Sequence, residues 1–332
     1  KFKDSLPFHR LESIFKRFKV DLTRATMGAW AICIAKDHRR LRKILFDELR
    51  KASVIHLDET KVQVLKEPGR AASSGSWMWT YRSTSDQGTT VLYEYRMTRS
   101  GGFLKKRLKN FRGVFVCDGY DGYNHLAKLK GYIRAGCWAH VRRYFFEAFN
   151  PDAPSSIAGL FLDKIALLYK YEEEFRDMLP QQRQKKRQEF SRPVVLEIEE
   201  LLNKHIAGVP PGSDLGKALR YLSGQWSRLQ VFLENGNVPI DNNLMENDIR
   251  PFAIGRKNWM FSDTRKGASA SAFYYSLIQT AVANGHEPYW YLLYLFHKLP
   301  SVDKRTEDLR SLLPMYVAPP IVADFCKREG YN

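Results

Sequence analysis

The sequence predicts an α/β fold, with a mixed five-stranded sheet flanked by helices, an all-helical insertion and a helical amino-terminal segment. Three observations support this fold class. Residues 53–135 contain short runs rich in β-branched and aromatic residues, separated by polar turns, as is typical of strands. Residues 151–236 and residues 5–50 instead carry apolar residues at helical spacing. The chain has 332 residues, which is enough to bury a large core.

These patterns divide the chain into five segments. Residues 1–50 form the helical amino-terminal segment, and residues 51–150 form the first part of the α/β core. Residues 151–236 are the helical insertion, which is bounded by proline and glycine breaks. Residues 237–298 return to the core, and residues 299–332 are a carboxy-terminal tail.

The amino-terminal segment is expected to contain two helices, over residues 6–18 and 23–37, joined by a short polar break. Two interpretations of this pair remain open. A helix-turn-helix would place Arg24 early in the second helix, where base contacts fall. The alternative is an ordinary helical hairpin that packs on the domain through apolar residues such as Trp30.

The order of elements in the core predicts its topology. Three strands with short links imply an antiparallel meander, and a strand that follows a helix implies a parallel crossover. A basic helix is expected over residues 103–111 and another helix over residues 139–149. The strands are expected at residues 53–65, 76–82, 89–96, 114–118 and 132–137. The order β-β-β-α-β-α-β-α is that of the ribonuclease H-like fold, in which the first and fourth strands lie side by side.

Asp58 interrupts the first predicted strand. Both faces of this strand carry apolar residues, which indicates a central position in the sheet. A carboxylate inside a buried strand costs several kcal/mol unless it is paired or bound to a metal. We therefore interpret Asp58 as a metal ligand, the alternative being a solvated aspartate at a strand end.

Asp118 ends the apolar run that begins at Val114. The carboxyl ends of strands are where open α/β sheets bind ligands. Asp118 and Asp121 each precede a glycine, so either could instead shape a turn. We favour Asp118 over Asp121 as the metal ligand. Because the first and fourth strands are neighbours in this fold, Asp58 and Asp118 are expected to meet.

Glu246 lies in a polar stretch, residues 240–251, that is typical of a helix start. Asn243 and Glu246 have the spacing of a capping box, with Asn243 as the N-cap. The spacing alone favours the cap, but capping and metal binding are compatible roles. Arg250 is four residues further on and lies on the same helix face, where it could pair with Glu246 or bind a phosphate.

The formal net charge of +17 predicts a polyanionic partner, most simply nucleic acid bound through its phosphates. The alternative is a solvated basic surface. Gly255 with its neighbours resembles a flexible strand-binding groove with cations and a stacking surface. A basic run at residues 181–188 is interpreted as a solvated helix face. The residues expected to contact DNA are Arg24, Arg142, Arg143, Asn243, Arg250, Arg256, Lys257 and Trp259.

Four scattered cysteines without disulfide spacing indicate a reducing compartment. Cys137 and His140 have the spacing of half a zinc site, but no second pair completes it, so a packed cysteine with a histidine near the active site is favoured. The most apolar window, residues 289–296, is too short to span a membrane. No secretory leader is visible, which predicts a cytoplasmic, nucleoid-associated protein. The chain begins with Lys1 rather than Met, so upstream sequence is expected.

Several motifs together resemble the insertion sequence 66 family of bacterial DDE transposases. They are Leu57-Asp-Glu-Thr60, Cys117-Asp-Gly-Tyr-Asp-Gly-Tyr-Asn124, Gly136-Cys-Trp-Ala-His-Val-Arg-Arg143, Ile240-Asp-Asn-Asn-Leu-Met-Glu246, Arg250-Pro251 and Gly255-Arg-Lys-Asn-Trp259. The resemblance runs from about Leu6 to about Pro314. It implies a ribonuclease H-like catalytic domain whose Asp, Asp, Glu triad falls on Asp58, Asp118 and Glu246. Family members usually carry a further amino-terminal zinc-binding region.

On this resemblance we expect two Mg²⁺ ions at the triad, with Mn²⁺ able to substitute. The expected reaction is cleavage at transposon ends followed by transfer of the 3′-hydroxyl into target DNA. A homo-oligomer on DNA is expected because two ends must be brought together. Two alternatives remain: a ribonuclease H-like nuclease or resolvase without strand transfer, and a non-catalytic DNA-binding protein derived from a transposase.

Overall fold

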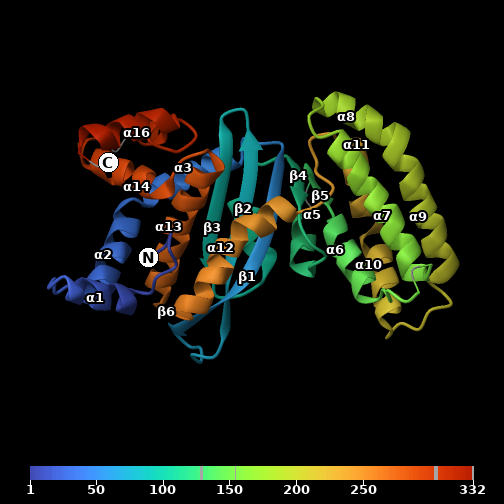
Figure 1. Ribbon diagram of the computed structural model, residues 1–332, viewed down its shortest axis with the longest axis horizontal. Coiled ribbons are helices and arrows are strands. Elements are labelled where there is room, and N and C mark those ends of the chain that lie inside the picture. Colours follow the sequence, from blue (N-terminus) through green and yellow to red (C-terminus); the bar gives the residue numbers. More distant parts are fainter. Residues whose placement is uncertain (128–129, 154, 303–305, 331–332) are drawn as a thin grey trace. The chain divides into compact units, whose positions relative to one another are not determined.

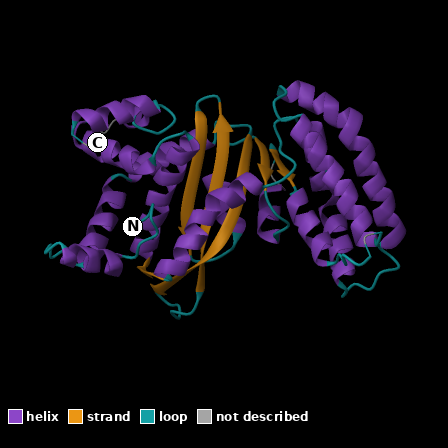
Figure 2. Cartoon of the chain, in the orientation of Figure 1, coloured by secondary structure: helices purple, strands orange, loops and turns teal. Residues whose placement is uncertain are grey.

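The computed structural model describes residues 1–127, 130–153, 155–302 and 306–330. The chain forms two compact units. The first comprises residues 1–103, 108–111 and 244–332, and the second comprises residues 104–107 and 112–243. Figure 2 shows the helices and strands of both.

The first unit combines a twisted sheet with helices from both ends of the chain (Figure 1). Its strands are β1 (Val54–Lys66), β2 (Gly75–Ser85), β3 (Gly88–Arg96) and β6 (Phe261–Thr264). Its helices are α1 (Phe8–Arg17), α2 (Arg24–Asp37), α3 (Arg39–Leu49), α12 (Asn243–Trp259, of which Asn243 belongs to the second unit), α13 (Arg265–Ala283), α14 (Pro288–Lys298), α15 (Thr306–Ser311) and α16 (Pro319–Arg328).

The second unit carries the remaining strands and the helical insertion. β4 (Gly113–Val116) and β5 (Tyr132–Ala135) are parallel. The helices are α4 (Leu104–Arg107), α5 (Asn124–Ala127), α6 (Trp138–Glu147), α7 (Ile157–Glu174), α8 (Pro180–Lys186), α9 (Arg192–His205), α10 (Asp214–Leu229) and α11 (Val231–Glu234). A π-helical turn over Arg187–Ser191 joins α8 to α9.

The strand order confirms the predicted fold class. β2 pairs antiparallel with both β1 and β3, as expected for a meander. The order in the sheet is β3-β2-β1-β4-β5, and β6 pairs with β1. β6 is a sixth, short strand that the sequence pattern did not indicate, and it runs parallel to the end of β1. The fold is a mixed α/β sheet flanked by helices, of the ribonuclease H-like type.

Helices cover both faces of the meander in the first unit. Residues at paired positions on neighbouring antiparallel strands point to the same face. Phe46 of α3 packs edge-on against Tyr81 on one face. On the other face Met78 and Tyr93 form a cluster with Phe252 of α12 and Tyr275 of α13. The strands are therefore buried on both sides, which explains their nearly continuous apolar runs.

The outer edge of β3 is covered by side chains of α13. Ser276 accepts a hydrogen bond from the Tyr93 N–H at 2.9 Å, and Thr280 accepts one from the Val91 N–H at 3.1 Å. Asn284, four residues further on, accepts one from the Thr89 N–H at 3.1 Å. The four-residue spacing matches the helical repeat, so one helix face satisfies the strand edge that would otherwise pair with another chain.

The basic run at residues 181–188 exposes Gln181, Gln182 and Lys185 to solvent, as expected, but Arg187 within it is buried. Arg187 is only 1% exposed, and its guanidinium donates to Glu172 at 2.7 and 2.5 Å. It also donates to the carbonyls of Phe232, Asn235 and Val238 at 2.7, 3.0 and 2.9 Å. Arginine can be buried here because each of its three guanidinium nitrogens donates to at least one oxygen, which no sequence pattern reports.

The predicted basic helix over residues 103–111 is also wrong in length. Only Leu104–Arg107 is α-helical, and Asn110 has a φ of +72°. A left-handed residue ends a helix, and asparagine tolerates that conformation better than most side chains. The chain therefore turns before it enters β4.

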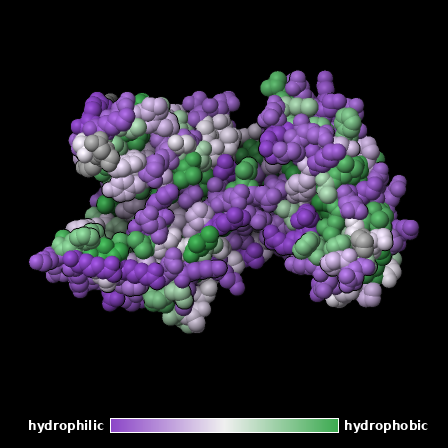
Figure 3. All heavy atoms as spheres, in the orientation of Figure 1, coloured by the Kyte–Doolittle hydropathy of each residue, from purple (hydrophilic) through white to green (hydrophobic). Residues whose placement is uncertain are grey.

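The amino-terminal helices form where the sequence placed them. The Thr23 hydroxyl caps α2 by accepting from the Thr26 N–H at 3.2 Å. The α2 helix packs on α13, where the Tyr274 hydroxyl donates to the Ala31 carbonyl at 3.3 Å. Trp30 is 55% exposed, so it is not the buried anchor that the hairpin interpretation expected. Apolar side chains accordingly lie on the surface near α1 and α2 (Figure 3).

Among the residues that the structure describes, no helix is both long enough and apolar enough to cross a lipid bilayer. This agrees with the sequence, in which the most apolar window is short. That window forms part of α14, which buries Tyr291 and Leu295 against neighbouring elements.

Candidate active site

Asp58 lies in the middle of β1 and is half-buried. Its register partner on β2 is Thr80, so Asp58 points to the sheet face that carries Met78 and Tyr93. One carboxylate oxygen accepts the Glu59 N–H at 2.8 Å. The strand is internal, as the two apolar faces predicted.

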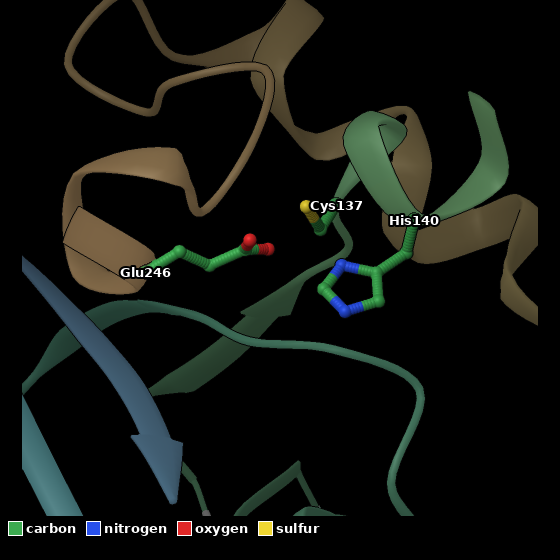
Figure 4. Close-up of side chains that lie close together, drawn as sticks. All are labelled: Cys137, His140 and Glu246. Carbon is green, nitrogen blue, oxygen red and sulfur yellow. The ribbon is translucent and has the colours of Figure 1, made fainter. Parts of the chain in front are cut away.

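Glu246 lies in the first turn of α12 and is half-buried. Figure 4 shows its side chain extended from this helix. α12 lies over the same sheet face as Asp58. The ring centroid of its Phe252 is 6.1 Å from that of Tyr93, which is on this face. Within the first unit, the fold therefore brings a strand aspartate and a helix glutamate to one face of the sheet.

An ion pair fixes α12 on that face. Arg82 of β2 donates to Asp248 at 2.7 Å, and both side chains are largely buried. The Tyr93 hydroxyl donates to the Asp248 carbonyl. Burial raises the pKa of Asp248, and the neighbouring Arg82 opposes that rise. Asp248 is two residues from Glu246, so this pair anchors the helical turn that carries the glutamate. Asp248 was not predicted as a functional residue, because its partner Arg82 is 166 residues away in the sequence.

The start of α12 follows a polar turn. The Asp241 carboxylate accepts the Asn243 N–H at 3.0 Å and the Asn243 side-chain amide at 2.6 Å. The helix starts near the predicted position, but Asn243 is its first residue rather than the N-cap that the capping box required. Asn243 itself is exposed and held by Asp241.

Asp118 lies two residues beyond β4, in the second unit. Its carboxylate accepts the Tyr120 N–H at 3.0 Å, and the buried Arg134 donates to its carbonyl at 2.5 Å. Asp118 therefore shapes a turn, as the alternative reading proposed, and one carboxylate oxygen takes part in that turn. Asp121 is exposed and accepts from the Asn124 amide at 2.9 Å.

The helical insertion packs on the Asp118 turn. A Cβ at Gly119 would lie only 2.7 Å from the Tyr221 ring of α10, so glycine permits this close approach. Burial raises the pKa of Tyr221, and the negative charge of Asp118 raises it further. The insertion thus helps to shape the surroundings of Asp118, which the sequence pattern gave no means of anticipating.

Cys137 and His140 lie together at the start of α6 (Figure 4). The Cys137 sulfur and a His140 ring nitrogen are within 4.8 Å of each other. The Cys137 Sγ accepts the Asn242 N–H at 3.2 Å, and burial raises the pKa of this thiol to about 12. Cys137 is only 2% exposed and its sulfur accepts a backbone N–H, as expected of a packed cysteine.

The cations expected to contact DNA fall into two groups. Arg24, Arg142, Arg143, Arg250 and Lys257 are exposed. Arg256 instead donates to the Lys61 carbonyl and lies 3.4 Å from the Thr60 hydroxyl, so it holds α12 against β1. Arg142 also lies over the Phe146 ring at 5.8 Å.

The predicted flexible groove at Gly255 is wrong. Gly255 is buried inside α12, where an added Cβ would meet the Tyr275 hydroxyl at 2.7 Å. Trp259 ends the same helix, half-buried and edge-on to Phe252 at 5.2 Å. The glycine here serves close packing rather than flexibility, and Trp259 offers only part of its ring to a base.

The donor types at the candidate site suit a hard divalent cation. Asp58 and Glu246 supply carboxylate oxygens on one sheet face, and such oxygens are the ligands that Mg²⁺ and Mn²⁺ prefer. Asp118, which belongs to the second unit, carries a carboxylate of the same type. The residues present therefore fit the metal that the sequence resemblance implies.

Comparison with known proteins identifies the family. Residues 1–270 match the family described as Transposase IS66 family, and residues 276–315 match the IS66 C-terminal element. Three uncharacterised proteins of Sinorhizobium fredii are similar to the chain. The protein y4qI is 30% identical to this chain over 87% of its length. The proteins y4jD and y4hP are 29% and 25% identical to it, each over 95% of its length. The chain spans 55%, 63% and 60% of their respective lengths. On the family match, which covers most of its length, the chain belongs to the IS66 family of transposases.

Proposed function

We propose that this transposase-family chain cleaves DNA at transposon ends and transfers the new 3′-hydroxyl into target DNA. Asp58, Asp118 and Glu246 are the proposed metal ligands. The observation that carries the proposal is the placement of Asp58 and Glu246 on one face of the first unit, in a chain of this family. Asp118 is included as the third ligand because the triad that the family resemblance implies falls on it.

The proposed reaction has two displacements at phosphorus. In the first, a water oxygen bonds to the scissile phosphorus and the 3′-oxygen leaves, giving a 3′-hydroxyl and a 5′-phosphate. In the second, that 3′-oxygen bonds to a target phosphorus and a target 3′-oxygen leaves. The second step conserves the number of phosphodiester bonds, so it needs no ATP.

Two Mg²⁺ ions bound at the carboxylates would supply acidification of the attacking water and stabilisation of the leaving oxygen. The protein's own contribution is position and charge. Arg82 and Asp248 keep α12 in place, so that Glu246 does not have to be ordered when DNA arrives. Arg142, Arg143, Arg250 and Lys257 are exposed cations, which we propose lie against DNA phosphates.

The test compares wild type with Asp58→Asn on DNA that carries the ends of the element, with Mg²⁺ present. Asp86→Asn, an exposed turn residue of the same unit, is the matched control. We expect Asp58→Asn to abolish nicking and to weaken Mn²⁺ binding measured by calorimetry, with Asp86→Asn unchanged in both. Equal nicking by wild type and Asp58→Asn would refute the assignment.

A second assay separates the alternatives. A pre-cut DNA end with a free 3′-hydroxyl is offered together with target plasmid. Joined product supports strand transfer, whereas nicking without joining supports a nuclease or resolvase. Neither nicking nor Mn²⁺ binding, with DNA affinity retained, would support the non-catalytic DNA-binding alternative.

A further inference from the structure

A cavity of about 880 Å³ opens in the first unit, away from the proposed carboxylate site. Its walls come from α2, α3, the end of β3 and the start of α13. Neither Asp58 nor Glu246 lines it. This volume lies within the range of pockets that hold small organic ligands.

The lining is strongly cationic. No carboxylate is among the lining residues, and the six cations are Lys36, Arg39, Arg42, Arg96, Arg265 and Lys266. They come from four separate elements, so the cavity gathers charges that are far apart in the sequence. A concave wall of like charges concentrates positive potential and attracts anions.

One buried carboxylate organises part of this wall. Glu94 is 3% exposed and lies 2.7 Å from Arg96 and 3.4 Å from Arg42. It also accepts from the Tyr81 hydroxyl at 3.0 Å. Two guanidiniums thus share one negative charge. The lining keeps a surplus of positive charge, and Arg42 and Arg96 are held in fixed positions.

The cavity also has an apolar side. Phe103 lies in the lining beneath the Arg96 guanidinium, which is 3.8 Å from its ring centroid. Met97 and Phe273 line the cavity as well. Cations beside a half-buried aromatic ring such as Phe103 are a combination that can bind a phosphate together with a nucleobase.

We propose that this cavity binds one to a few nucleotides of unpaired DNA. The phosphates lie against Lys36, Arg39 and Lys266, and a base lies against Phe103. Lys266 is in the first turn of α13, where the helix N–H groups add to the attraction for phosphate. The proposal rests on the proposed function only in taking DNA as the partner, because the cavity is separate from the carboxylates.

The test measures binding of fluorescein-labelled (dT)₆ to the whole chain by anisotropy, in EDTA. Lys36→Glu and Lys266→Glu are the variants. Lys43→Glu on α3, exposed and outside the lining, is the matched control. We expect each pocket variant to weaken binding by about tenfold. The slope of log K against the logarithm of the salt concentration should become shallower by about 0.7 for each lost phosphate contact. Lys43→Glu should stay within about twofold of wild type.

Ser269→Trp fills the cavity without changing its charge and should weaken (dT)₆ binding as well. Unchanged thermal unfolding of this variant shows that it is folded. Free dTMP should compete with (dT)₆ at lower concentration than inorganic phosphate does, because only dTMP carries a base. Unchanged binding by the folded pocket variants, or an equal loss in Lys43→Glu, would overturn the proposal.

Two further arms complete the design. A duplex of the same length should lose less affinity than (dT)₆ in the pocket variants. Equal losses would show a general phosphate surface and sink the idea of a nucleotide pocket. Asp58→Asn should bind (dT)₆ like wild type, so a failure of the catalytic proposal leaves this result standing.

Discussion

Replacing Arg187 with methionine should severely destabilise the helical insertion. The guanidinium is buried between α7, the π-helical turn and the segment after α11, where it donates five hydrogen bonds to Glu172 and three carbonyls. Methionine has a similar length but donates none. The change leaves a carboxylate and three carbonyl oxygens without their donor.

The magnitude follows from these contacts. Removing one partner of a buried ion pair costs about 3–5 kcal/mol. Glu172 is 14% exposed and can recover some water, which places the pair near the low end of that range. The carbonyls add to the cost where water cannot reach them. We expect a loss of about 4 kcal/mol, a factor of roughly a thousand in the opening equilibrium.

Hydrogen exchange of peptides from α8 and α9 measures this local opening directly. Arg192→Met is the matched control, because Arg192 pairs with Glu234 on the surface, where the side chains are 37% and 62% exposed. That pair should contribute at most about 1 kcal/mol to the free energy of unfolding. Amide hydrogen exchange in Arg187→Met that is less than about tenfold faster than in wild type would contradict this role of Arg187. Exchange no faster than in Arg192→Met would contradict it as well.

Three other outcomes follow from the same structure. Asp248→Asn should slow nicking by about tenfold, because Arg82 loses its partner and α12 loosens next to Glu246. The control Asp263→Asn removes an exposed pair with Lys66 and should leave the nicking rate unchanged. Equal nicking rates in the two variants would contradict a positioning role for Asp248. Cys137 should resist alkylation at pH 8, since a pKa of about 12 leaves about one thiolate in ten thousand. Because its folded pKa lies above the unfolded value near 9, folding stability from this thiol is present below pH 9 and is lost as the pH rises towards 12. Mass spectrometry after iodoacetamide treatment should find label on the exposed Cys33 first, and early label on Cys137 would show a thiolate.

Local features of the fold could be predicted from the sequence because their causes are local. The β-branched and aromatic runs at β1, β2 and β3 favour strands because such side chains fit a pleated, half-buried surface. Asp58 could be recognised as a candidate ligand because an aspartate between two apolar faces conflicts with the strand around it. The polar stretch around Asn243 likewise indicated that a helix starts there.

The tertiary structure decided what depends on distant partners. Arg187 looked like a surface cation in the sequence, yet its oxygen partners come from residues 15 to 51 positions away. Gly255 looked flexible, but Tyr275 approaches so closely that only glycine fits. The cationic cavity gathers side chains from four elements. A sequence reports the chemistry of each side chain and the local preference of the backbone, whereas burial and partnership are set only when separate elements pack together.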